Sequence, residues 1–159
     1  MSPSRRNSLR LSCYDYRAGW FFLTLCSFGR RPLFGDIMGA ELRISTIGQC
    51  VLEHFRRVPI HRPDCTVHEL ALMPDHLHAI LEMRRSMRGG LGTVISHFKR
   101  GVSLEITGLG LLTAGEVWQR GYYERVIRSS EELHQTRLYI RENLLASVVG
   151  PRISNRIQR

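Results

Sequence analysis

The sequence predicts an α+β fold formed by a single domain. Its 159 residues are the length of one ordinary domain, and a hydrophobic content of 43% is enough to build a core. Segments with the periodicity of strands alternate with segments of helical periodicity in the order β-α-β-β-α-β-α. This order is the split β-α-β pattern of a ferredoxin-like sandwich, an antiparallel sheet with helices on one face, followed here by one C-terminal helix.

The first half of this pattern contains three strands and one helix. Residues 19–25 are rich in aromatic and strand-forming side chains, so they are expected to form the first strand. Across residues 40–58 apolar side chains recur at helical spacing, which predicts a helix that ends at Pro59. Two strands, separated by a Pro-Asp pair, are expected within residues 66–83.

The second half continues with a helix, a strand and a final helix. Two adjacent glycines open an apolar helical pattern over residues 91–102, and the glycine-rich residues 107–115 are expected to form a loop. Alternation over residues 122–128 predicts the last strand. Ser129 or Ser130 can then cap the C-terminal helix, whose first turn carries two glutamates.

The overall charge favours a polyanionic partner. There are 23 basic and 14 acidic residues, which gives a net charge of +9. Lys99 is the only lysine, and arginine binds phosphate in a bidentate manner, although genomic base composition can also produce an arginine bias. The four cysteines show no CxxC spacing and are expected to be reduced in the cytoplasm. The apolar residues 20–28 are too short to span a membrane, so no membrane partner is expected.

His76 and His78 are the first candidates for chemistry. They alternate along a predicted strand, so both imidazoles should leave the same face of the sheet. Two neutral imidazoles are a modest ligand set for zinc, manganese, iron or copper that leaves positions open to a substrate. The alternative is that a half-buried strand carries two histidines only for packing.

Tyr139 and Asn143 are the second candidates, because they lie four residues apart on one face of the predicted C-terminal helix. If that face meets the histidine strand, a cation held by the histidines and the Asn143 amide oxygen would polarise a phosphodiester while the Tyr139 phenolate attacks phosphorus. The product would be a phosphotyrosine. The alternatives are a core aromatic for Tyr139 and a helix-end contact for Asn143.

Together with these residues, the order of several motifs resembles the REP-associated tyrosine transposases, within the wider HUH single-tyrosine transposases of insertion sequences. The resemblance covers about residues 20–146. The motifs that carry it are RRPLFG at 30–35, MPDHLH at 73–78, FK at 98–99, VWQRGYYE at 117–124 and YIREN at 139–143.

The resemblance implies a function and a site. It implies cleavage and rejoining of single-stranded or hairpin DNA, with Tyr139 as the nucleophile and with His76, His78 and Asn143 as ligands of Mg²⁺ or Mn²⁺. It implies a monomer or a homodimer in the cytoplasm, associated with the nucleoid when bound to DNA. Two positions depart from the family pattern: Leu144 replaces a usual proline and should let the helix continue, and Asp75 replaces a usual asparagine and adds negative charge near the metal.

On this interpretation residues 18–149 form one catalytic domain, preceded by a basic and mobile arm at 1–17 and followed by a short tail at 150–159. Basic and aromatic side chains beside the expected site are candidates for contacts with nucleic acid through phosphate binding or base stacking. They are His97, Lys99, Arg100, Arg120, Tyr122 and Tyr123.

Two other functions compete with this one. A catalytically inactive nucleic-acid-binding module of ferredoxin-like fold would share the charge and the aromatic residues. A phosphohydrolase acting on nucleotides would release a small product, but Ile80 stands where a third alternating histidine would favour it. A zinc deaminase is disfavoured because the sequence has neither an HxE nor a CxxC element.

Overall fold

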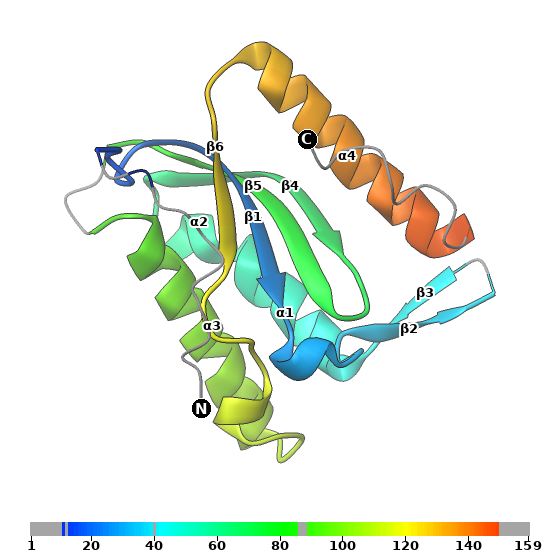
Figure 1. Cartoon of the computed structure of the whole chain (residues 1–159). Helices are drawn as coiled ribbons and strands as arrows, with labels where there is room; N and C mark the ends of the chain where they lie inside the picture. The colour runs from blue at the N-terminus through cyan, green and yellow to red at the C-terminus, as the bar shows by residue number, and fades with distance from the viewer. Residues whose placement is uncertain (1–10, 12, 40, 86–88, 150–159) are drawn as a thin grey trace, which may run out of the picture.

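The computed structural model describes residues 11, 13–39, 41–85 and 89–149. A four-stranded antiparallel sheet with the strand order β4-β5-β1-β6 forms its centre. The first strand, β1, lies between β5 and the last strand, β6, as in a ferredoxin-like sandwich, which confirms the predicted fold (Figure 1). The strands are β1 (Gly19–Cys26), β4 (Cys65–Leu72), β5 (His76–Met83) and β6 (Tyr123–Ile127).

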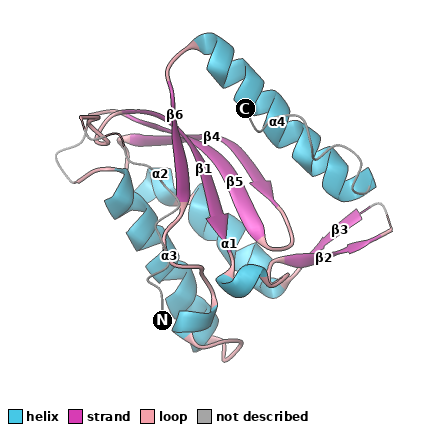
Figure 2. Ribbon diagram, in the orientation of Figure 1, coloured by secondary structure: helices cyan, strands magenta, loops and turns pink. Residues whose placement is uncertain are grey.

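The main core lies on the face of the sheet that α1 (Thr46–Arg56) and α3 (Leu91–Gly108) cover (Figure 2). Alternate side chains of β1 point to this face, where Phe21, Leu23 and Leu25 are fully buried. Both helices contribute an apolar stripe to the same cluster. These two helices are the ones that the ferredoxin-like pattern predicts on one face of the sheet.

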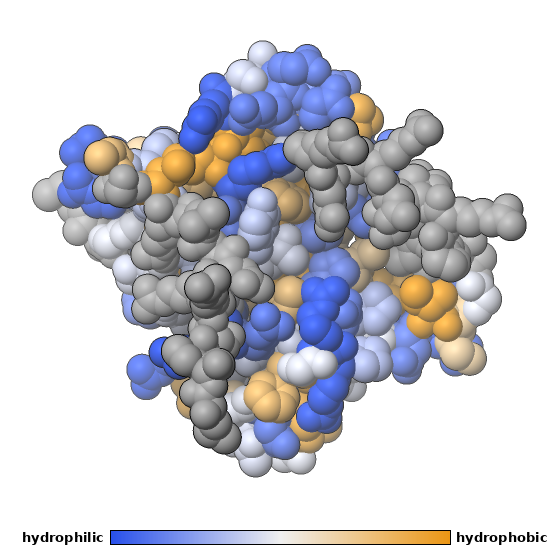
Figure 3. Space-filling view, in the orientation of Figure 1, coloured by the Kyte–Doolittle hydropathy of each residue, from blue (hydrophilic) through white to orange (hydrophobic). Residues whose placement is uncertain are grey.

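The opposite face of the sheet is covered by α4 (Ser130–Val149), which passes Leu144 without a break, as expected in the absence of proline. A small second core holds this helix. It contains Phe22, Ala71, Ile80, Ile127 and Ile140. In Figure 3 the outward side of α4, at the top of the view, is mostly hydrophilic, and hydrophobic side chains are visible beneath it.

The helix predicted over residues 40–58 is wrong at its beginning. The strands β2 (Gly35–Met38) and β3 (Glu41–Ile44) form a separate hairpin, and α1 begins only at Thr46. Ser45 ends the hairpin because its hydroxyl accepts a hydrogen bond from the Gly48 N–H and caps the helix. Apolar spacing alone could not detect this cap, since Ile44 fits either pattern.

Short elements connect the layers. Pro59 does not end a helix but lies at the start of α2 (Val58–His61), where a proline costs no hydrogen bond. The short 3₁₀ turn η1 (Phe28–Arg30) follows β1, and a second one, η2 (Ala114–Glu116), precedes β6. None of the described helices is both long and apolar enough to cross a membrane.

Candidate active site

The alternation of β5 carries His76 and His78 to the α4 side of the sheet. Leu77 between them is fully buried in the main core, so the two imidazoles leave the opposite face. In the register with β1, His76 lies opposite Cys26 and His78 opposite Thr24. The Nε2 atoms of the two histidines approach each other to 3.2 Å.

A different partner holds the Nδ1 atom of each ring. The Asp75 carboxylate oxygen lies 2.6 Å from His76 Nδ1, and the Thr24 hydroxyl lies 2.9 Å from His78 Nδ1. With both Nδ1 atoms engaged, the two Nε2 atoms are the ones turned toward the space between the rings. This is the arrangement in which outer hydrogen bonds orient histidine ligands.

The surroundings of the pair favour the uncharged form of both rings. Burial lowers the pKa of His76, and burial together with the neighbouring His76 charge lowers the pKa of His78 to about 3. The side chain of His78 is only 4% exposed. Because the charged imidazolium form is disfavoured, each ring keeps one nitrogen with an electron pair that a cation can bind.

The geometry of this pair fits a divalent metal ion. Ligands at about 2.1 Å from an ion are separated by about 3.0 Å at octahedral right angles and by about 3.4 Å at tetrahedral angles. The observed 3.2 Å lies between these values. Among the described residues no group of three or more His, Cys, Asp and Glu side chains converges on a metal site.

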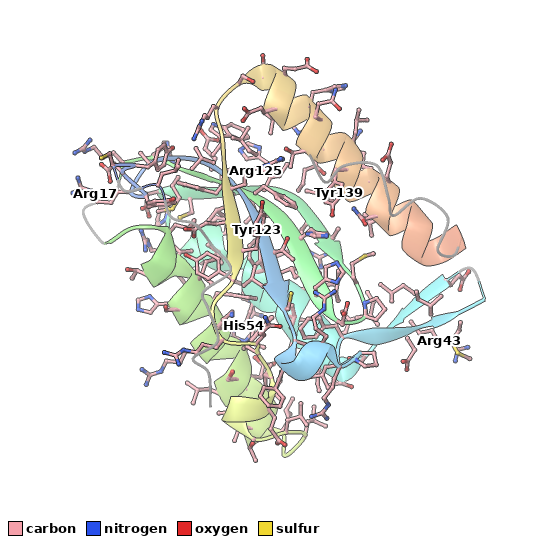
Figure 4. The ribbon with its side chains drawn as sticks, in the orientation of Figure 1. Arg17, Arg43, His54, Tyr123, Arg125 and Tyr139 are labelled. Atoms are coloured by element: carbon pink, nitrogen blue, oxygen red, sulfur yellow. The ribbon has the colours of Figure 1, made fainter. Side chains whose placement is uncertain are left out.

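Tyr139 reaches this pair from α4. Its ring centroid lies 5.6 Å from that of His78 and 5.8 Å from that of Phe22, with edge-to-face geometry in both contacts. Figure 4 shows Tyr139 on the side of α4 that faces the sheet. The structure therefore brings the helix tyrosine and the two sheet histidines into one neighbourhood.

Asn143 lies one turn further along α4 and is partly buried. Its amide nitrogen donates a hydrogen bond of 2.8 Å to the backbone carbonyl of Tyr139. This contact within the helix is the kind that the alternative interpretation expects, and it leaves the amide oxygen as an acceptor, so the ligand role of Asn143 stays a prediction. Asn143 therefore lies on the same side of α4 as Tyr139, one helical turn away.

Lys99 is half-buried, and its ammonium group contacts the protein backbone. Its Nζ donates to the backbone carbonyl of Gln119 at 3.0 Å and to that of Gly121, and it lies 5.5 Å from the centre of the Trp118 ring. Burial lowers the pKa of Lys99 to about 8. These contacts connect α3 to the segment that leads into β6.

The other predicted DNA contacts lie at the surface in most cases. His97, Arg100 and Arg120 are exposed, and Tyr123 is 44% exposed on β6 at the edge of the sheet. Tyr122 packs against the main core. Figure 4 shows Tyr123 and Arg125 on the same strand, and Arg125 lies over Phe22 with 5.6 Å between its guanidinium carbon and the ring centre.

Sequence reasoning missed two residues of this site. Thr24 meets His78 only through the pairing of β1 with β5, which no local pattern reveals. Arg30 binds Asp75, with 2.9 Å between Nε and Oδ2, although the two residues are far apart in sequence. The RRPLFG motif marks Arg30 as unusual but does not indicate its partner.

The family follows from a comparison over most of the chain. Residues 40–143 match the family described as Transposase IS200 like. The chain is a member of this family. The IS200-like transposases are enzymes that cut and rejoin DNA, and the family uses a divalent metal. This match confirms the wider family of insertion-sequence transposases to which the resemblance pointed.

Individual proteins of similar sequence or structure are also known. An uncharacterized protein of Haemophilus influenzae is 29% identical, and the alignment covers 87% of each chain. A REP-associated tyrosine transposase bound to a REP hairpin superposes with a TM-score of 0.62 at 20% identity, over 94% of this chain and 76% of that one. A candidate transposase from Deinococcus radiodurans R1 superposes with a TM-score of 0.54 at 16% identity, over 85% of this chain and 96% of that one. At these identities the two structures establish the fold of this IS200-like transposase.

Proposed function

We propose that this IS200-like transposase cuts and rejoins single-stranded, hairpin-associated DNA by metal-assisted transesterification through Tyr139. The observation that carries the proposal is the contact between the Tyr139 ring and the His78 ring, 5.6 Å apart, although one belongs to α4 and the other to β5. A nucleophile beside two neutral imidazoles is the minimum that this chemistry requires.

Each residue has a defined role in this reaction. A Mg²⁺ or Mn²⁺ ion on His76, His78 and the Asn143 amide oxygen would polarise the scissile phosphodiester. The Tyr139 oxygen loses its proton and bonds to phosphorus, while the bond from phosphorus to the leaving strand oxygen breaks and that oxygen takes up a proton. The phosphotyrosine retains the energy of the broken bond, so a second strand end can reverse the step without ATP.

The DNA partner is supported by charge and by similarity. The net charge of +9 suits a polyphosphate backbone, and exposed His97, Arg100 and Arg120 can contact phosphates, while Tyr123 can stack on a base. The REP-associated transposase that shares the fold is bound to a REP hairpin. For this chain we extend the same partner to single strands that carry a hairpin.

The remaining assignments follow the same proposal. Residues 18–149 act as the catalytic domain. The prediction of a mobile arm at 1–17 is wrong for its last residues, because Tyr14 and Tyr16 pack against the main core, whereas residues 1–10 and the tail at 150–159 lie outside the described residues. The enzyme works as a monomer or a homodimer in the cytoplasm, on the nucleoid when bound to DNA.

A denaturing gel tests the proposal directly. Wild type incubated with Mn²⁺ and end-labelled single-stranded DNA bearing a hairpin should produce a band of protein linked to DNA. Tyr139→Phe should lose this band and retain DNA binding in a mobility-shift assay. Tyr14→Phe is the matched control, because Tyr14 packs on Tyr16 and Phe21 away from the histidines, and it should retain the band.

The histidines complete the test. His76→Ala and His78→Ala should each suppress cleavage while Tyr139 is intact. An adduct that survives Tyr139→Phe would show that another residue is the nucleophile. DNA binding with no adduct for the wild type, over a range of hairpin substrates and metals, would favour the inactive nucleic-acid-binding module instead.

A further inference from the structure

We infer that Asp75, held by Arg30, is a positioning residue that fixes the His76 ring with its Nε2 electron pair directed toward the cation site. This inference rests on the proposed function, because it assigns the device that orients one of the proposed ligands. It concerns two residues to which the reaction itself assigns no role.

The carboxylate of Asp75 bridges two partners. One oxygen lies 2.6 Å from His76 Nδ1, and the other lies 2.9 Å from Arg30 Nε. An ionised carboxylate accepts hydrogen bonds and cannot donate them, so Nδ1 must be the nitrogen that carries the hydrogen. A neutral imidazole has only one N–H group, and therefore Nε2 presents its electron pair.

Arg30 is itself held in an unusual conformation. Its φ of 57° lies in the left-handed region, and it is the single described residue other than glycine with a positive φ. The backbone N–H of Arg30 donates to the Ser27 carbonyl at 3.1 Å, and the guanidinium donates to Cys26 Sγ at 2.8 Å. Residues kept in such conformations cluster at functional sites, where the surrounding structure enforces them.

Backbone groups near Arg30 also form hydrogen bonds with the turn that contains Asp75. Ser27 N–H donates to the Asp75 carbonyl at 2.9 Å, and Phe34 N–H donates to the Pro74 carbonyl at 2.9 Å. Ser27 and Phe34 are both fully buried, so these anchors are rigid. Figure 1 shows η1 beside the turn that joins β4 to β5. Asp75 is thus held by hydrogen bonds to the backbone carbonyls of Pro74 and of Asp75 itself, and by the ion pair of its side chain with Arg30.

Stability does not explain this arrangement. The side chain of Arg30 is 52% exposed and that of Asp75 is 24% exposed. Ion pairs with this much access to water contribute little to folding. A strained backbone that supports a weak ion pair is better explained by the ring that the pair orients.

Two measurements test the inference, one without metal and one with it. In metal-free protein labelled with ¹⁵N-histidine, NMR at neutral pH should show His76 as the Nδ1–H tautomer, with its signals assigned from a His76→Asn sample. Asp75→Ala should shift His76 toward the Nε2–H tautomer. The Mn²⁺ affinity, measured by calorimetry, should fall by about 10- to 100-fold, the usual loss when an outer partner of a histidine ligand is removed.

Asp75→Asn separates hydrogen bonding from charge. Its carboxamide oxygen can still accept from Nδ1, so it should retain the tautomer and most of the affinity that Asp75→Ala loses. If the asparagine variant loses as much as the alanine variant, the effect is one of charge and the inference is wrong. Asp36→Ala removes an equal charge from the exposed strand β2 and should change neither measurement.

Arg30→Ala and its neighbour Arg31→Ala form a second matched pair. Each removes one positive charge, but only Arg30 contacts Asp75, so only Arg30→Ala should reduce the Nδ1–H fraction of His76. An unchanged tautomer and unchanged affinity in Asp75→Ala would overturn the inference. A wild type that binds no Mn²⁺ would instead contradict the proposed metal site, and the metal-free tautomer would then decide the inference by itself.

Discussion

Burial of His78 predicts that the metal-free protein loses stability in mild acid. Burial, with the nearby His76 charge, lowers the pKa of His78 to about 3, against 6.5 in an unfolded chain. At pH values between these two pKa values, His78 is protonated in the unfolded chain but not in the folded one. The free energy of unfolding therefore falls as the pH decreases. The contribution is fully present above a pH of 6.5 and is lost as the pH falls toward 3.

The size of the effect follows from the same two values. At about pH 5, which is about 1.5 below the pKa of His78 in the unfolded chain, protonation stabilises the unfolded state by RT ln(1 + 10^1.5). Relative to about pH 8, this stabilisation is about 2 kcal/mol. His78→Asn supplies a side chain that can still meet the Thr24 hydroxyl but does not titrate. Between about pH 8 and about pH 5, the free energy of unfolding of His78→Asn should therefore decrease less than that of the wild type. The difference between the two decreases should be about 2 kcal/mol.

Urea unfolding followed by circular dichroism in EDTA, at several pH values between these limits, provides the measurement. His61→Asn, at an exposed position of α2, controls for replacing a histidine by asparagine. Parallel pH profiles for wild type and His78→Asn would refute the reasoning, because the acid sensitivity would then arise elsewhere in the chain.

Two further predictions concern the helix and the sheet that form the site. Ile140 is 1% exposed in the small core beneath α4, so Ile140→Ala should cost about 2 to 4 kcal/mol in urea unfolding and slow adduct formation while Mn²⁺ binding persists. Leu138→Ala, at a 37% exposed position of the same helix, is its control, and equal losses in both variants would contradict the packing argument. Thr24→Val removes the hydroxyl beside His78 Nδ1 and should cost about 1 to 3 kcal/mol and weaken Mn²⁺ binding, whereas Thr24→Ser should preserve both. Equal Mn²⁺ affinities in the valine and serine variants would exclude this role for the hydroxyl.

The match between sequence and structure is strongest where periodicity reflects burial. The strand at 19–25, the helix from residue 91 and the last helix all occur where apolar spacing and capping residues predict them. The prediction fails at residues 41–44, where a hairpin strand replaces the start of a helix. Helical spacing and a short strand are indistinguishable over so few residues, and contacts of this hairpin with the rest of the chain decide the outcome.

The candidate site divides in the same way. Local geometry places His76 and His78 on one face of a strand, and Tyr139 and Asn143 on one side of a helix, because both periods are properties of the backbone. The distance between strand and helix is a different matter. It depends on α4 packing against the sheet through Ile140 and its neighbours, which only the folded chain brings together.

The sequence by itself therefore determined the fold class, the basic character and the residue types available for chemistry, since these depend on composition and on short-range spacing. Only the tertiary structure decided that Tyr139 lies against His78, that Thr24 meets one imidazole, and that Arg30 holds the aspartate beside the other. These contacts join segments distant along the chain, and strand register and helix packing, which no local pattern encodes, set their distances.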